Sequence, residues 1–126
     1  MKNSHTKILI VEDETRLLYS LAFVLRRKGY EVTPVTNAET ALSEIKGLEN
    51  GFFKLIISDI HLPGMSGLDF IEKLQNMGDP TPFLVITAYK GKPIFDALEN
   101  RGVRHILQKP FDSTELLDRI SRALTE

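Results

Sequence analysis

Five short apolar segments alternate along this sequence with five segments whose apolar residues recur at helical spacing. The short segments are rich in β-branched residues and lie at 7–11, 30–35, 53–58, 82–86 and 103–108. Strands that alternate with helices in this way pair in parallel, because each helix carries the chain back along the sheet. Strands that are apolar along their whole length also need cover on both faces. The pattern therefore predicts an α/β fold with one parallel sheet between two layers of helices.

Capping residues and glycines set the expected limits of the helices. We expect five helices, over 15–28, 38–48, 68–77, 92–101 and 113–124. Asn37 can cap the second helix, whose segment stops at Asn50–Gly51, and Asp112 or Ser113 can cap the fifth. The fourth helix has only a thin apolar face. Pro34 cannot donate a hydrogen bond to a neighbouring strand, which indicates that the second strand lies at an edge of the sheet.

Composition limits the class of protein and its partners. At 126 residues and 42% hydrophobic content, the chain can bury a core and fits a single domain over residues 1–126. Sixteen basic side chains stand against seventeen acidic ones, for a formal charge of −1. A nearly neutral chain has no long-range attraction for nucleic acid, so we expect no direct nucleic-acid binding. The absence of cysteine excludes disulfides and thiolate metal sites.

The sequence also favours a cytoplasmic location. No apolar run approaches the roughly 20 residues that span a bilayer, so we expect no membrane partner. Residues 1–5 lead into the first strand rather than into the hydrophobic region of a signal peptide. The lack of cysteine is compatible with a reducing compartment.

Polar residues end or follow four of the five predicted strands. They are Glu12 with Asp13, Asp59, Thr87 and Lys109. The carboxyl ends of parallel strands lie at one edge of the sheet, where ligands bind in open α/β folds. Three carboxylates in one pocket raise one another's pKa strongly unless a cation is present. A hard divalent cation such as Mg²⁺, or Mn²⁺, would resolve this conflict because it prefers oxygen ligands.

The same groups suit phosphoryl transfer to an aspartate. A carboxylate can attack phosphorus and form an aspartyl phosphate. Asp59 is the natural nucleophile, because it lies centrally and is flanked by apolar residues, whereas the adjacent pair Glu12 and Asp13 is better suited to hold metal. The Thr87 hydroxyl and the Lys109 ammonium would stabilise the phosphoryl oxygens. Taken singly, Asp59 could cap a turn, Thr87 could be a strand residue and Lys109 could be a solvated surface charge. Taken together, these residues favour a phospho-acceptor site.

Four motifs resemble the receiver domain of two-component response regulators. They are V-E-D-E at 11–14, S-D-I-H-L-P-G-M-S-G at 58–67, I-T-A at 86–88 and K-P-F at 109–111. The resemblance covers nearly the whole chain. It implies a flavodoxin-like (βα)5 doubly wound fold with strand order 2-1-3-4-5 and helices on both faces. It also implies that Asp59 takes a phosphoryl group from the phosphohistidine of a sensor histidine kinase or from a phosphotransfer protein.

The resemblance implies a metal site and an output face as well. Asp13, Asp59 and the backbone carbonyl of His61 would bind Mg²⁺, and Glu12 would act mainly through water. The Lys109–Pro110 peptide bond would be cis, as in many relatives. The phosphorylated domain would bind an effector domain or protein through the fourth helix, fifth strand and fifth helix. It would catalyse its own phosphorylation and dephosphorylation without being a turnover enzyme.

One position departs from the family pattern. Family members usually carry Tyr or Phe three residues before the lysine, whereas this chain has Ile106. A β-branched aliphatic side chain has few χ1 options and no polar tip, so an aromatic rotation cannot be the readout at this switch position. Thr87 and Lys109 would still sense the phosphoryl group. We expect the relay to use His105, the loop after the fourth strand, or Tyr89.

Two bulky residues are expected to flank the phosphoryl group. His61 lies two residues beyond the nucleophile, and Tyr89 lies two residues beyond the threonine. Both side chains would limit the approach of water. The sequence therefore predicts slower hydrolysis of the aspartyl phosphate than small residues at these positions would give.

Two alternative functions remain open from the sequence. An aspartate-nucleophile phosphohydrolase would share the metal and the acyl phosphate, but such enzymes carry a DxD signature and here the third residue is His61. A receiver-like module that binds partners without phosphorylation is compatible with Ile106. The sequence also leaves open the cognate kinase, the output, and whether the chain is a stand-alone receiver or part of a longer protein.

Overall fold

Five strands and five helices alternate along the chain in the computed structural model, which describes residues 5–126. Residues 1–4 lie outside the described residues. They belong to the segment 1–5, which the sequence predicts not to be a signal peptide. The strands are β1 (Lys7–Val11), β2 (Glu31–Val35), β3 (Leu55–Asp59), β4 (Phe83–Thr87) and β5 (His105–Gln108). The helices are α1 (Thr15–Arg27), α2 (Ala38–Ile45), α3 (Gly67–Asn76), α4 (Lys92–Asn100) and α5 (Ser113–Thr125).

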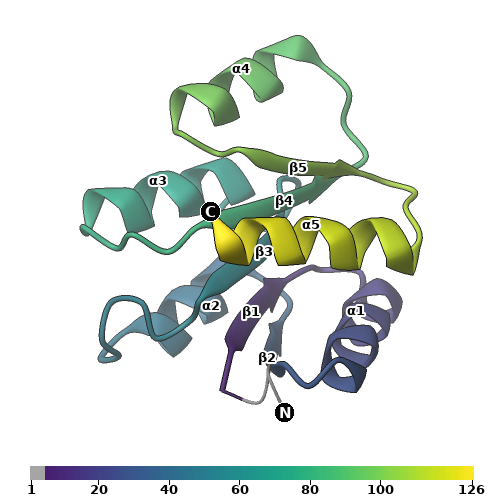
Figure 1. Cartoon of the computed structure of the whole chain (residues 1–126). Helices are drawn as coiled ribbons and strands as arrows, with labels where there is room; N and C mark the ends of the chain where they lie inside the picture. Colours follow the sequence, from purple (N-terminus) through teal and green to yellow (C-terminus); the bar gives the residue numbers. More distant parts are fainter. Residues whose placement is uncertain (1–4) are drawn as a thin grey trace.

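All five strands form one parallel sheet in the order β2-β1-β3-β4-β5, as predicted (Figure 1). Pro34 lies on the edge strand β2, where its missing N–H group predicted it, and it pairs in register with Ile10 of β1. The central strands β3 and β4 are buried along their whole length. The sheet order reverses between β1 and β3, and a reversal of this kind opens a crevice at the carboxyl ends of the strands.

Two hydrophobic clusters cover the two faces of the sheet. Alternate strand residues point to opposite faces, so Ile56 of β3 belongs to one cluster and Ile57 to the other. Helices α2, α3 and α4 pack on the Ile56 side, and α1 and α5 pack on the Ile57 side. In Figure 1, α5 crosses in front of the sheet. None of the helices within residues 5–126 combines the length and the apolar character that a membrane crossing needs.

Helix α2 is shorter than the sequence pattern indicated. Its amino end is capped as expected, because the Thr40 N–H group donates a 2.7 Å hydrogen bond to Asn37 Oδ1. The helix ends at Ile45 rather than continuing through Leu48. Lys46 leaves the helical region with ψ 128°, and Gly47 has φ +85°, which favours glycine. Leu48 is consequently 37% exposed and does not contribute to the buried face.

The carboxyl-terminal elements follow the expected pattern with small differences. Helix α4 forms, and its thin apolar face buries only Leu98 completely. Strand β5 begins at His105, two residues later than predicted, although Val103 is buried just before it. Asp112 caps α5 in a capping box, in which the Glu115 N–H group donates to Asp112 Oδ1 and the Asp112 N–H group donates to Glu115 Oε1. This cap fixes the start of α5 at Ser113, four residues after Lys109.

Candidate functional site

The fold brings the polar residues at the strand ends to one edge of the sheet. Asp59 and Thr87 are the last residues of β3 and β4, while Glu12 and Lys109 directly follow β1 and β5. Glu12, Asp59 and Thr87 are all buried, with exposed fractions of 0%, 5% and 0%. Their burial follows from the sheet, because the strands that carry them lie between helices on both sides. Buried polar groups of this kind require partners.

Lys109 supplies that partner to two carboxylates at once. Its Nζ atom lies 2.6 Å from Asp59 Oδ2 and 2.9 Å from Glu12 Oε1. The lysine side chain is only 21% exposed. Burial alone would lower the pKa of Lys109, but hydrogen bonds and charge attraction from Asp59 and Glu12 outweigh it and raise the pKa. The ammonium group is therefore held in its charged form, and it ties the end of β5 to the ends of β1 and β3.

The carboxylate of Asp59 is fixed through both of its oxygens. Oδ1 accepts hydrogen bonds from the backbone N–H groups of Ile60 at 2.6 Å and His61 at 3.2 Å. Oδ2 faces Lys109. Charge-assisted hydrogen bonds of this kind are short and strong. The side chain of Asp59 is consequently oriented before any ligand arrives.

Glu12 is the more deeply buried acid. Burial raises its pKa, although hydrogen bonds from the Glu14 N–H group at 3.0 Å and from Lys109 act in the opposite direction. The charge of Asp59 raises the pKa further. Burial therefore outweighs the hydrogen bonds and the attraction of Lys109, and it disfavours the charged form of Glu12.

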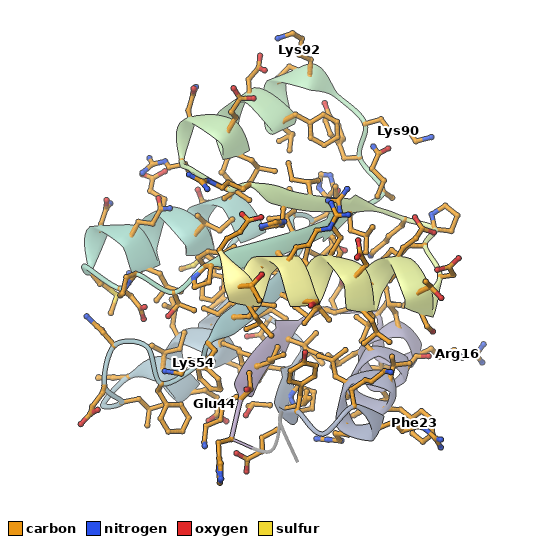
Figure 2. All side chains as sticks on the ribbon, in the orientation of Figure 1. Arg16, Phe23, Glu44, Lys54, Lys90 and Lys92 are labelled. Carbon is orange, nitrogen blue, oxygen red and sulfur yellow. The ribbon has the colours of Figure 1, made fainter. Side chains whose placement is uncertain are left out.

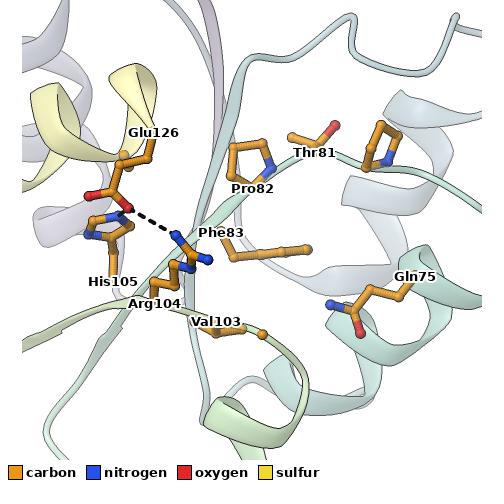
Figure 3. A pocket seen from close by; sticks show the side chains of 11 residues that line it. Gln75, Thr81, Pro82, Phe83, Val103, Arg104, His105 and Glu126 are labelled. Carbon is orange, nitrogen blue, oxygen red and sulfur yellow. Dashed lines mark hydrogen bonds and ion pairs between the residues drawn. The ribbon is translucent and has the colours of Figure 1, made fainter.

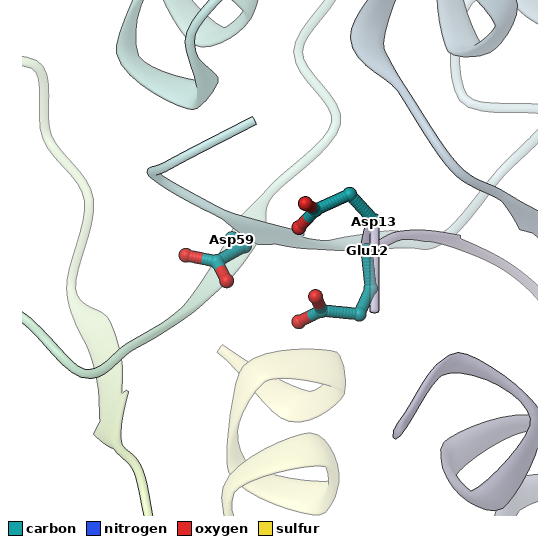
Figure 4. Close-up of side chains that lie close together, drawn as sticks. All are labelled: Glu12, Asp13 and Asp59. Carbon is teal, nitrogen blue, oxygen red and sulfur yellow. The ribbon is translucent and has the colours of Figure 1, made fainter. Parts of the chain in front are cut away.

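Three carboxylates lie close enough together to share a metal ion. One oxygen from each of Glu12, Asp13 and Asp59 lies within 4.8 Å of the other two, and Asp13 is exposed at the rim (Figure 4). Carboxylate oxygens are the donors that Mg²⁺ and Mn²⁺ prefer. The donor chemistry of the residues thus fits a hard divalent cation, and such a cation would also offset the repulsion between Glu12 and Asp59.

Thr87 connects the site to the loop between β4 and α4. Its Oγ1 atom accepts a 3.0 Å hydrogen bond from the Tyr89 N–H group, and its carbonyl accepts one of 2.9 Å from the Lys109 N–H group. The Gln108 side chain donates to the Tyr89 carbonyl at 3.3 Å. The backbone of this loop is therefore held both by the threonine hydroxyl and by the end of β5. The Lys109–Pro110 peptide bond is cis.

The two bulky residues expected beside the nucleophile and the threonine contact each other. The rings of His61 and Tyr89 lie edge to face, with centroids 5.7 Å apart and planes at 62°. The Tyr89 ring also lies so close to Gly91 that a Cβ atom at Gly91 would overlap it. The loops after β3 and β4 thus meet through these two rings.

The switch position Ile106 lies on β5, three residues before Lys109. It is partly buried and packs against the cluster on the Ile56 side of the sheet. Its carbonyl accepts a 2.7 Å hydrogen bond from Arg119 Nη1 on α5. His105 instead contacts the last residue, with its Nε2 atom 3.0 Å from Glu126 Oε1. Among the three relay candidates, the β4–α4 loop and Tyr89 contact Thr87, whereas these contacts place His105 at the carboxyl end of α5.

Gly67 and Glu39 support the site in ways that the sequence did not reveal. Gly67 is the first residue of α3 and does not have a positive φ, so turn geometry does not require a glycine there. A Cβ atom there would overlap the carbonyl oxygen of Asp59 and lie 2.8 Å from Ile60 Cα. Glu39 Oε2 accepts a 2.9 Å hydrogen bond from the Met65 N–H group. Both contacts are tertiary, and neither leaves a local pattern in the sequence.

A cavity of about 350 Å³ lies elsewhere, at the amino ends of β4 and β5 (Figure 3). Its lining includes Gln75, Thr81 and Phe83. Figure 3 shows Glu126 between His105 and Arg104 at one side of the cavity. Its lining includes neither the carboxylates Glu12, Asp13 and Asp59 nor Thr87 or Lys109. The cavity is therefore separate from the carboxylate site.

Comparison with known families identifies the class of protein that this fold and this set of residues define. The family model for the response regulator receiver domain matches residues 8–121. The chain belongs to this family, as the four sequence motifs implied. Its relatives by sequence and its neighbours by structure agree with that assignment.

Curated relatives are about twice as long as this chain. The uncharacterized transcriptional regulatory protein YkoG of Bacillus subtilis is 34% identical over 126 residues, which is all of this chain and 53% of YkoG. The sensory transduction protein RegX3 of Mycobacterium tuberculosis is 34% identical over 119 residues, which is 94% of this chain and 51% of RegX3. The chain thus spans about half the length of the curated relatives that it matches.

Solved receiver structures superpose closely on this chain. A CheY-like response regulator receiver domain protein from Methanospirillum hungatei gives a TM-score of 0.88 at 30% identity, covering 97% of this chain and 95% of that one. The chemotaxis response regulator CheY4 of Vibrio cholerae gives 0.83 at 28% identity, covering 94% and 98%. The predicted flavodoxin-like fold is therefore confirmed.

Proposed function

We propose that this chain is a phospho-accepting receiver domain over residues 1–126, in which Asp59 takes a phosphoryl group from the phosphohistidine of a sensor histidine kinase or phosphotransfer protein. The observation that carries the proposal is the contact of Lys109 with both Asp59 and Glu12, beside a buried Thr87. Structure alone rarely requires three acids, a hydroxyl and an ammonium at the ligand-binding edge of a sheet. A complete set of this kind suits transfer of a charged group.

The step that we propose is a displacement at phosphorus. An oxygen of the Asp59 carboxylate attacks the phosphorus, a new O–P bond forms, and the P–N bond to the donor imidazole breaks. The electron pair of that bond stays on the imidazole nitrogen, which takes up a proton. Lys109 loses one carboxylate partner as Asp59 becomes a neutral acyl group, and it gains a phosphoryl oxygen in its place.

Asp13, Asp59 and the carbonyl of His61 would hold Mg²⁺ or Mn²⁺, with Glu12 acting mainly through water. When bound, the cation neutralises the acids and the equatorial phosphoryl oxygens. The chain itself contributes orientation, because backbone N–H groups and Lys109 already fix both oxygens of Asp59. The domain catalyses this modification of itself, and we do not propose turnover of a separate substrate.

The proposed readout runs through the loop between β4 and α4. If the Thr87 hydroxyl moves to donate to a phosphoryl oxygen, its Oγ1 atom leaves the Tyr89 N–H group, and the loop must adjust. Ile106 does not offer an aromatic rotation, so the backbone of this loop and its link to Gln108 carry the change. The face of α4, β5 and α5 would then bind an effector domain or protein in the cytoplasm.

Intact-mass analysis after incubation with acetyl phosphate and Mg²⁺ tests the proposal. We expect one phosphoryl group on the native chain, none on Asp59→Asn, and none without the divalent cation. Asp69→Asn is the matched control, because Asp69 is exposed on α3 and its substitution should leave uptake unchanged. A folded native chain that takes up no phosphoryl group would favour the phosphorylation-independent binding module instead. Steady release of phosphate from a phosphomonoester, which cannot serve as a small-molecule phosphodonor to a receiver in the way that acetyl phosphate does, would favour the phosphohydrolase.

A further inference from the structure

The loop that follows Asp59 is closed at its base. The Gly67 N–H group donates a 2.8 Å hydrogen bond to the carbonyl of Ile60, so the chain leaves and returns to the same place within seven residues. The loop contains His61, whose N–H group bonds to Asp59. Its apolar residues Leu62 and Met65 pack against the cluster on the Ile56 side of the sheet. The base of the loop is thus fixed, and the geometry of its tip depends on what holds Met65.

Glu39 holds the tip of this loop from a different element. Residue Glu39 lies in the first turn of α2, and its Oε2 atom accepts the 2.9 Å hydrogen bond from the Met65 N–H group. The carboxylate fits closely over Gly64, because a Cβ atom at Gly64 would lie 2.5 Å from Oε2. Gly64 has φ +72°, a conformation that glycine adopts without strain. The Glu39 carboxylate can therefore approach the loop this closely only because residue 64 has no side chain.

We infer that Glu39 is a positioning residue for divalent-cation binding, and that it acts by fixing residues 61–64 between the Ile60–Gly67 bond and the Met65 N–H group. The inference rests on the proposed function, because it concerns the loop that carries the His61 carbonyl. Only four residues separate the two fixed points. A loop this short, tied at both ends, transmits the position of Met65 to the backbone of His61.

A simpler role for Glu39 predicts a different result. An acid in the first turn of a helix interacts favourably with the helix dipole, and Glu39 is exposed and correctly placed for this. If that were its only role, its loss would weaken α2 slightly. It would not change the loop after β3 or the binding of a cation. The two roles are therefore separated by measurements on Met65 and on the cation, not by stability.

Three variants of the full chain test the inference. Glu39→Ala removes the acceptor, and Glu39→Gln keeps an oxygen that can accept the hydrogen bond. Glu44→Ala is the matched control, because Glu44 is exposed near the other end of the same helix and makes no side-chain hydrogen bond or ion pair within residues 5–126 (Figure 2). We would measure hydrogen exchange of the Met65 amide in metal-free protein and Mg²⁺ affinity by NMR titration of backbone amides.

Glu39→Ala should accelerate Met65 exchange and weaken Mg²⁺ binding about fivefold, a change of about 1 kcal/mol at 1.4 kcal/mol per tenfold. Glu39→Gln should recover most of both losses, and Glu44→Ala should match the native chain. Unchanged Mg²⁺ affinity in Glu39→Ala, or an equal loss in Glu44→Ala, would overturn the inference. Met65 exchange needs no metal, so a native chain that does not bind Mg²⁺ would count against the proposed function while this readout still tests the contact of Glu39.

Discussion

Replacing Gly67 with alanine should disturb both the stability of the domain and the position of its proposed nucleophile. The added methyl group would overlap the carbonyl oxygen of Asp59 and lie 2.8 Å from Ile60 Cα, whereas ordinary contacts begin near 3.4 Å. Both contacted atoms are backbone, so no side chain can rotate away. The start of α3 must therefore retreat from the end of β3 by roughly an ångström, which stretches the 2.8 Å hydrogen bond from the Gly67 N–H group to the Ile60 carbonyl.

Overpacking of this kind typically costs about 1–3 kcal/mol, and we expect about 2 kcal/mol for Gly67→Ala. In a domain of 126 residues this corresponds to a fall of roughly 8 °C in melting temperature. Urea unfolding followed by circular dichroism measures the change in free energy. Intact-mass analysis of phosphoryl uptake measures the effect on Asp59, which should react more slowly because its backbone has moved.

Gly78→Ala is the control at the other end of α3. Gly78 has φ +81°, and a Cβ atom there would meet nothing within 4 Å. Its substitution should cost about 1 kcal/mol from the backbone conformation alone and leave phosphoryl uptake unchanged. A Gly67→Ala protein with native stability and native uptake would refute the reasoning, as would an equal loss of uptake in Gly78→Ala.

Three further predictions concern the site loops and the core. His61→Ala and Tyr89→Ala should each shorten the lifetime of the aspartyl phosphate, measured by loss of the mass increment with time, and an unchanged lifetime would contradict the flanking role. The pKa of Glu39 is lowered by hydrogen bonds from the N–H groups of Met65 and of Glu39 itself. Because the pKa is lower in the folded chain, the contact is fully present above the unfolded pKa of 4.5, and it is lost as the pH falls through the folded pKa. The Met65 amide shift should accordingly titrate with a midpoint below 4.5, and a midpoint above it would contradict the contact. Phe70→Ala should cost about 3–5 kcal/mol in urea unfolding, because Phe70 is completely buried against Phe83 and its loss leaves a cavity; a cost below about 1 kcal/mol would show that the core collapses around the gap.

The residues at the strand ends could be predicted from sequence because two simple facts place them. Asp59 and Thr87 each end an apolar run, and Lys109 follows the last one. Once the strands are parallel, their carboxyl ends share an edge. The prediction needed no knowledge of side-chain contacts, which is why residues separated by 50 and 97 positions could be grouped correctly around Lys109.

The residues that support the site could not be predicted in this way. Glu39 carries no signal beyond that of an acid at the start of a helix, and its contact with Met65 depends on how α2 packs beside the β3–α3 loop. Gly67 lies in a motif full of turn residues, so its role in close packing is hidden by a more common explanation. The early end of α2 at Ile45 has a similar cause, since Gly47 could equally have been tolerated within a longer helix.

Lys109 links the charge of the site to the far edge of the sheet. Its ammonium contacts two acids, while its backbone N–H group bonds to the Thr87 carbonyl and the preceding Gln108 side chain bonds to Tyr89. A group that changes the charge on Asp59 must therefore alter the ion pairs of Lys109, and the backbone of the same lysine is bonded to the end of β4. This connection does not involve the side chain of Ile106. The lack of an aromatic residue at that position consequently removes one route for the signal but leaves a second, made of backbone, which we infer to be the one this chain uses.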